Sequence, residues 1–111
     1  MTITKRSIGN CRILDVNGKV VIGTGTAALR NAIQDAAKDY PKKIVLNLAN
    51  VPYIDSPGIG ELVYNYNYLT DQGISLVLLN PIKKIHQLLV IAKLVTVFET
   101  FDNENLAVAS F

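Results

Sequence analysis

The strongest constraint on the fold is a pair of short apolar runs separated by an amphipathic stretch. The runs are Ile44 to Leu48 and Ser75 to Leu79, and β-favouring residues dominate both. Nearly continuous apolar runs of this length are typical of strands covered on both faces. Between them, Pro57 to Asp71 carries apolar residues at helical spacing, and Gly73 is a suitable helix stop. This order predicts a βαβ unit with parallel strands and a right-handed crossover.

The N-terminal part of the chain adds strands and a helix to this unit. Thr2 to Ile8 and Cys11 to Val16 are predicted strands, and the Asn17-Gly18 turn leads into a further predicted strand at Lys19 to Ile22. Helical spacing then runs from Thr26 to about Tyr40, where Pro41 ends it.

The C-terminal part predicts three shorter elements. A helix starts at Asn80-Pro81, runs to about Lys93 and buries Ile82, Ile85, Leu89 and Ala92. A short strand is expected at Val95 to Thr100 and a short helix at Asn103 to Ser110. The predicted fold is therefore one α/β domain over all 111 residues, with a mixed sheet of four or five strands and helices packed mainly on one face.

Composition excludes several functional classes. The net charge is +2, and the 11 basic and 9 acidic residues are mixed along the chain, which argues against a nucleic-acid-binding face. Cys11 is the only cysteine, so an internal disulfide and a Cys-rich metal site are excluded. We see no signal-peptide core and no run near the ~18 apolar residues of a membrane span, so we expect a cytoplasmic protein without a membrane partner.

Chemistry concentrates in the segment from Val51 to Val63. Ser56 precedes Pro57, which predicts Ser56 as the N-cap of the following helix. Gly58 and Gly60 leave the first turn nearly bare, so that another backbone or a partner can approach it. A plain helix cap explains the Ser-Pro pair equally well, but two helical glycines cost up to about 1 kcal/mol each relative to alanine.

The stretch from Tyr53 to Gly60, YIDSPGIG, resembles the signature of bacterial STAS domains of the anti-sigma factor antagonist kind. The runs Ile44 to Leu48, Ile74 to Asn80 and Leu94 to Phe98 are similar to the family's central, next and last strands. The resemblance covers nearly the whole chain and implies the same α/β fold.

This resemblance also implies a function. Ser56 matches the family's phosphorylation site. The unphosphorylated protein would bind an anti-sigma factor that is also a serine kinase, releasing a sigma factor, and a serine phosphatase would reverse the phosphorylation. The implied protein is not an enzyme and has no catalytic residue, metal or cofactor. Its partner-binding residues would be Asp55, Pro57, Gly58, Gly60, Glu61 and Tyr64.

Two alternatives stay open. Pro57 replaces the small residue of many relatives, and Val21 stands where they often carry an acidic one, which favours a STAS scaffold that is never phosphorylated. A small enzyme or nucleotide binder is the third class, but no nucleophile–base pair or P-loop lysine supports it, and His86 is a distant single histidine. For Tyr64 and Tyr68, a turn apart on one helix, partner contact and plain solvation are both open.

Overall fold

The two apolar runs form the centre of a five-stranded sheet. In the computed structural model, which describes residues 1–110, the strands lie in the order β1-β2-β3-β4-β5. β1 pairs antiparallel with β2, and every other neighbouring pair is parallel. The strands are β1 Thr2–Ile8, β2 Cys11–Asn17, β3 Lys43–Asn50, β4 Ser75–Leu79 and β5 Thr100–Phe101; the helices are α1 Thr24–Ala36, α2 Ser56–Asp71, α3 Lys83–Ile91 and α4 Glu104–Ala109.

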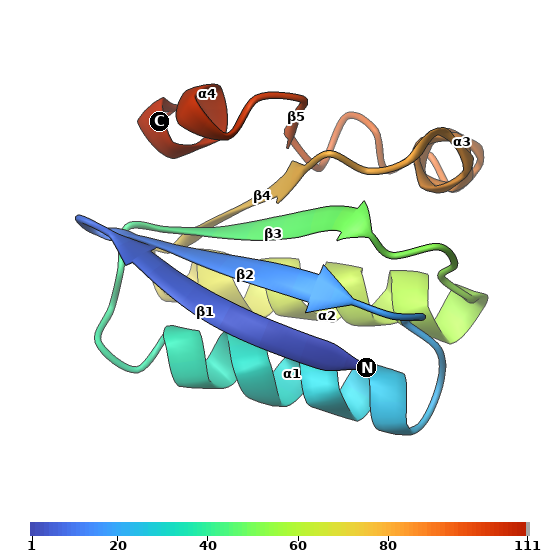
Figure 1. Ribbon diagram of the computed structural model, residues 1–111, viewed down its shortest axis with the longest axis horizontal. Helices are drawn as coiled ribbons and strands as arrows, with labels where there is room; N and C mark the ends of the chain where they lie inside the picture. Colours follow the sequence, from blue (N-terminus) through green and yellow to red (C-terminus); the bar gives the residue numbers. More distant parts are fainter. Residues whose placement is uncertain (111) are drawn as a thin grey trace.

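Both faces of the sheet are covered, but unequally. α1 and α2 lie side by side along one face, and the short α4 lies on the other (Figure 1). Along β3, Leu46 belongs to the main core beneath α1 and α2, whereas its neighbour Val45 belongs to the smaller cluster that includes Ala107 of α4. Burial on both faces explains why β3 and β4 are apolar at nearly every position. The predicted α/β class, the mixed sheet and the one-sided packing of the helices are confirmed.

Two predictions in the first half of the chain were wrong. Lys19 to Ile22 is not a strand: only Val20 forms a bridge, to Ile54, and the chain turns at once into α1. α1 ends at Ala36 instead of Tyr40, whose side chain is 74% exposed and whose φ is +51°. A residue before proline is disfavoured in the helical region, so the chain leaves the helix before Pro41 and turns towards β3.

In the second half, α3 begins at Lys83, later than Asn80-Pro81. Asn80 has a φ of +53°, and its N–H donates to the Phe101 carbonyl at 2.8 Å, so Asn80 stays with the sheet. α3 buries Ile85 and Leu89; Ile82 is only partly buried, and Ala92 is exposed.

The predicted last strand is also displaced. Leu94 to Phe98, which resembled the family's last strand, forms turns, and β5 is only Thr100–Phe101. The N–H groups of Val97 and Phe98 both donate to the Leu94 carbonyl at 3.0 Å, and the Phe98 side chain is buried in the main core. The burial of Phe98 overrides the strand preference of this stretch. Within residues 1–110, we find no helix with the length and apolar character that a membrane crossing requires.

An ionic network ties the C-terminal helix to the edge of the sheet. Arg6 on β1 donates to both carboxylate oxygens of Asp15 on β2, at 2.7 and 3.0 Å, and to both of Glu104 on α4, at 3.2 and 2.6 Å. The hydrogen bonds from Arg6 hold the pKa of Asp15 below its ordinary 3.8 and that of Glu104 below its ordinary 4.5. The folded protein therefore binds fewer protons than the unfolded chain as the pH falls through this range.

Replacing Arg6 by glutamine tests this network. We expect Arg6→Gln to lower the free energy of unfolding by about 1 kcal/mol at pH 7, because the pairs are partly exposed and screened by solvent. The stabilisation is complete above the ordinary carboxyl pKa values and is lost as the pH falls through the lowered ones. The difference from wild type should therefore shrink below about pH 4.

Denaturant unfolding at both pH values measures this difference. Lys5→Gln is the matched control, because Lys5 lies on the same strand and, among residues 1–110, pairs only with exposed Asp35, at 3.4 Å. An Arg6→Gln effect of equal size at pH 7 and in acid would contradict the ionic account.

Candidate functional site at the N-terminus of helix α2

The cap of α2 is Asp55, and not Ser56 as the sequence suggested. The Asp55 carboxylate accepts hydrogen bonds from the N–H of Gly58 at 2.7 Å and from the N–H of Ile22 at 3.0 Å. Its backbone is extended, with φ −86° and ψ 177°, as an N-cap residue requires. Asp55 therefore starts the helix and also fastens it to the loop between β2 and α1.

Ser56 is the first helical residue and is exposed. Within residues 1–110 its hydroxyl takes part in no hydrogen bond, because the capping position is already filled by Asp55. The residue stands at the rim of a shallow, mainly apolar hollow of about 360 Å³ between α2 and α3, which is also lined by Tyr53, Ile54, Ile59, Leu88, Ile91 and Ala92. The Ser56 side chain is thus exposed at the surface.

The two glycines of the first turn have different environments. A Cβ on Gly58 would lie 2.3 Å from the Val20 carbonyl oxygen and 2.7 Å from Cγ2 of Ile54, so any side chain there would push the β2–α1 loop away. A Cβ on Gly60 would meet nothing within 4 Å. Packing therefore requires glycine at position 58. It does not require glycine at position 60, where the absence of a side chain leaves the exposed side of the helix bare.

Glu61 was predicted to contact a partner, but its carboxylate does not lie at the surface. Its side chain is only 6% exposed and forms a two-pronged ion pair with Arg30 of α1, with both N–O distances 2.9 Å. Asn65, one turn further along, donates its Nδ2–H to a Glu61 carboxylate oxygen at 2.7 Å. Glu61 holds α1 and α2 together. A partner would contact Arg30, which Glu61 holds in place, and not the Glu61 carboxylate itself.

Tyr64 lies on the surface, and 45% of it is exposed. The Arg30 guanidinium sits 4.2 Å from the centre of its ring, and Tyr68 stacks at 6.5 Å between ring centres. Sequence reasoning missed Arg30, because its partner Glu61 lies 31 residues away and nothing in the local pattern marks the pair. The structure thus gathers Arg30 and Tyr64 on the exposed side of the helix pair.

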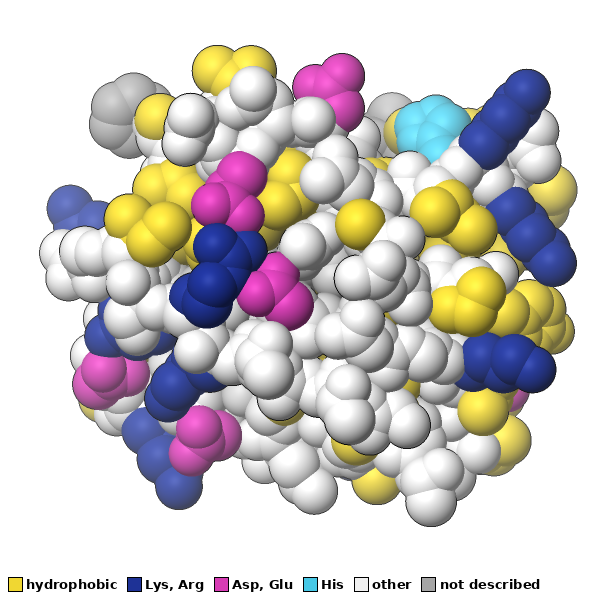
Figure 2. Space-filling model, in the orientation of Figure 1, with side chains coloured by type: hydrophobic (Ala, Val, Ile, Leu, Met, Phe, Trp, Pro, Cys, Tyr) yellow, Lys and Arg dark blue, Asp and Glu magenta, His cyan; other side chains and the backbone are white. Residues whose placement is uncertain are grey.

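The surface around Ser56 is largely apolar, with Lys84 at its border. Ile22 is 71% exposed and Ile91 77%, and the Lys84 ammonium lies 5.3 Å from the centre of the Tyr53 ring. Hydrophobic and basic side chains gather at the end of the molecule where α3 lies (Figure 2). Exposed apolar groups bordered by charge are typical of protein–protein contact surfaces.

The remaining chemical candidates lie elsewhere. His86 is exposed on α3, and no cluster of three or more His, Cys, Asp or Glu side chains that could hold a metal occurs among residues 1–110. Cys11 is buried beneath α4, and burial raises the pKa of its thiol. A raised pKa leaves little reactive thiolate at neutral pH.

Comparison with known proteins agrees with this architecture. The sequence model of the STAS domain matches residues 2–107, so the chain belongs to the STAS domain family. A comparison with curated proteins finds no relative.

Solved structures with the same fold come from proteins of different kinds. The protein TM1081 of Thermotoga maritima has a TM-score of 0.86 at 21% identity, over 96% of this chain and 91% of its own. Unphosphorylated SpoIIAA, the Bacillus anti-sigma factor antagonist, has a TM-score of 0.79 at 16% identity, over 96% of this chain and 93% of its own. A sulfate transporter family protein from Wolinella succinogenes reaches 0.80 at 22% identity, over 95% and 87%. At these identities the likeness establishes the fold.

Substituting the two glycines separately tests the geometry of the first turn. We expect Gly58→Ala to lower the free energy of unfolding by about 2 kcal/mol, because the new methyl group overlaps the Val20 carbonyl. Gly60→Ala is the matched control: it should leave stability unchanged or raise it by up to about 1 kcal/mol, since alanine favours the helix. Thermal and denaturant unfolding measure both. Equal destabilisation by the two substitutions would contradict the close contact at Gly58.

Proposed function

We propose that this protein is an anti-sigma factor antagonist that works by binding and is switched off by phosphorylation of Ser56. In the unphosphorylated form, the surface around the start of α2 binds an anti-sigma factor that is also a serine kinase, so that a sigma factor is released in the cytoplasm. The kinase adds a phosphate to Ser56, binding ends, and a serine phosphatase restores it. Catalysis by this chain itself is not part of the proposal.

The observation that carries the proposal is the availability of the Ser56 hydroxyl. Asp55 caps the helix, so Ser56 has no structural task that phosphorylation would disturb. The residue lies at the surface beside the bare Gly60 position and the exposed Ile22. A partner seated on this apolar surface would cover Ser56, and a phosphate there would separate the two proteins.

Electrostatics support a switch that acts on the interface and leaves the fold intact. A phosphate adds about −1.5 to −2 charges. At a helix N-terminus, negative charge is favoured by about 0.3–1 kcal/mol, which helps the domain to remain folded. Asp55 is held by two backbone N–H groups and stays next to the phosphate, so the surface becomes strongly acidic. A loss of about 4 kcal/mol in binding corresponds to a roughly thousandfold drop in affinity.

A STAS scaffold that is never phosphorylated is the second candidate. Pro57 directly follows Ser56 and restricts the backbone conformations that a kinase could bind. Val21 provides no acidic side chain near the site. The exposed Ile22 beside Val21 would suit a permanent apolar contact. In this case the same surface would bind its partner regardless of the state of Ser56.

A pull-down from the source cell lysate, before and after ATP is added, distinguishes the two candidates. Before ATP is added, wild type and Ser56→Ala should both recover a serine-kinase anti-sigma factor, identified by mass spectrometry, whereas Ser56→Asp should recover at least about tenfold less. The physical reason is the negative charge placed where the partner sits. After ATP is added, the wild-type protein should gain the mass of one phosphate and release the partner, whereas Ser56→Ala should stay unmodified and keep it.

Circular dichroism and melting provide the control for folding. Ser56→Asp should melt within a few degrees of wild type, because an acidic residue in the first helical turn is favourable. Equal recovery of the same partners by all three proteins, without phosphorylation, would overturn the switch and leave the constitutive scaffold.

A further inference from the structure

The far edge of the sheet is only partly closed. β5 pairs with β4 at just two positions, Leu78 with Thr100 and Leu79 with Phe101. β4 starts three residues earlier, at Ser75. The first half of β4 therefore lacks a neighbour on the side where β5 would continue.

The direction of the backbone groups identifies the unpaired position. The N–H of Ser75 donates to the Lys42 carbonyl, on the β3 side, at 3.0 Å. On the opposite side, the N–H of Leu78 donates to the Glu99 carbonyl at 2.9 Å. Peptide groups alternate in direction along a strand, so the N–H and C=O of Leu76 point to the same side as those of Leu78. The described part of the chain provides no partner for Leu76 there.

The edge is kept open by an ordered segment. Val95 to Phe98 has the composition of a strand and could have covered Leu76, but it folds as turns. Phe98 is 1% exposed and packs edge-on against Tyr66 of α2, with 5.3 Å between ring centres. Because the Phe98 side chain packs in the core, the segment bends away from β4. It pairs with β4 again only at Glu99.

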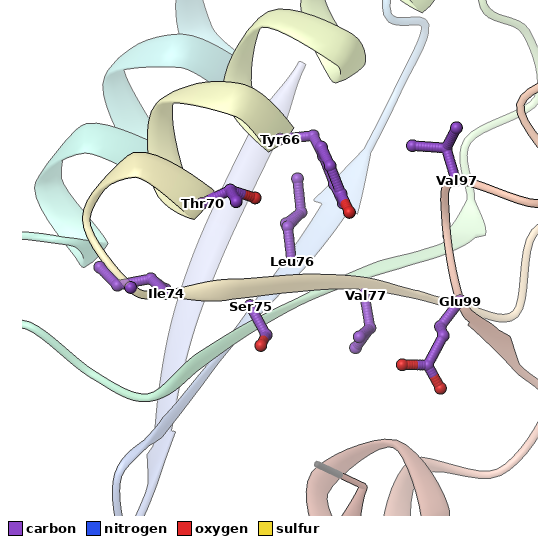
Figure 3. Close-up of a pocket in the computed structure, with 9 residues that line it drawn as sticks. Tyr66, Thr70, Ile74, Ser75, Leu76, Val77, Val97 and Glu99 are labelled. Atoms are coloured by element: carbon purple, nitrogen blue, oxygen red, sulfur yellow. The ribbon is translucent and has the colours of Figure 1, made fainter.

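A groove of about 330 Å³ follows this open edge. Figure 3 shows Tyr66 and Val97 on one side of β4, and Ser75 and Glu99 on the other. Both sides combine apolar and hydroxyl groups, since Thr70 lies on the side of Tyr66 and Val77 lies on the side of Ser75. The carboxylate of Glu99 is on the second side. Glu99 is the only charged residue in the lining and forms no ion pair within residues 1–110.

We propose that this groove binds an extended segment of a partner protein, which adds a short strand to β4 opposite Leu76 and places a lysine or arginine against Glu99. The backbone of the segment supplies the two hydrogen bonds that Leu76 lacks, as in other cases of strand addition. Alternate side chains of a strand point to opposite faces, so an apolar residue next to the basic one would meet Tyr66 and Val97.

Charge also separates this edge from the other edge of the sheet. β1 carries Lys5 and Arg6 on its exposed strand, and such charges protect a free edge against pairing. A basic segment would be attracted by Glu99, whereas Lys5 and Arg6 of β1 are already paired with carboxylates. The inference is independent of Ser56, which lies at the start of α2, outside the residues that line this groove.

Two synthetic peptides serve as probes in an NMR titration of the full chain. One is a blocked heptapeptide in which four valines alternate with three lysines, and the other has glutamate in place of lysine. The lysine peptide should shift the amide signals of residues 74–77 and 97–99 and slow hydrogen exchange at Leu76. Methylation of its central three backbone nitrogens should abolish these effects, because the strand hydrogen bonds are then lost.

Charge-reversed variants make the test specific. Glu99→Lys should weaken the lysine peptide by about fivefold or more, and the glutamate peptide should then bind more tightly than the lysine peptide. Asp102→Lys is the matched control, because it changes the net charge equally but lies outside the groove. Either no binding at millimolar peptide, signal shifts confined to β1, or equal weakening by both variants would overturn the proposal.

Discussion

The two hydrogen bonds of the Asp55 carboxylate are the interaction on which the rest of the site depends. One starts α2 at Gly58, and the other holds the loop after β2 at Ile22. This loop must lie close to the helix, because the Val20 carbonyl occupies the space that a side chain on Gly58 would need. Asp55 thus fixes the distance between the β2–α1 loop and α2, and the exposed surface formed by Ile22, Ser56 and Gly60 is a consequence of that distance.

Adjacent residues consequently have separate tasks. Asp55 maintains the structure, and Ser56 is left at the surface with its hydroxyl unused. A similar division occurs one turn further along α2, where the buried Glu61 holds Arg30, and Arg30 in turn lies over the exposed ring of Tyr64. A surface supported in this way can change its charge without losing its shape, which is what the proposed switch requires.

The central βαβ unit could be predicted because its signals are local: apolar runs of strand length, helical spacing and a glycine stop. The capping residue could not be assigned, since aspartate and serine are both good N-caps and only the loop contact at Ile22 favours Asp55. Leu94 to Phe98 has strand composition but is bent by the burial of Phe98, which depends on α2. The pairing of Glu61 with Arg30 was equally hidden, because it joins two helices and leaves no local pattern.

The central claim is that Asp55 caps α2 and that Ser56 has no part in the cap. Amide hydrogen exchange tests this claim most directly. The N–H groups of Ile22 and Gly58 are compared in wild type, Ser56→Ala and Asp55→Ala. The account predicts that both amides keep their protection in Ser56→Ala, whereas both lose it in Asp55→Ala, because their common acceptor is removed. Loss of protection in Ser56→Ala, with protection retained in Asp55→Ala, would show that Ser56 is the cap and would contradict the account.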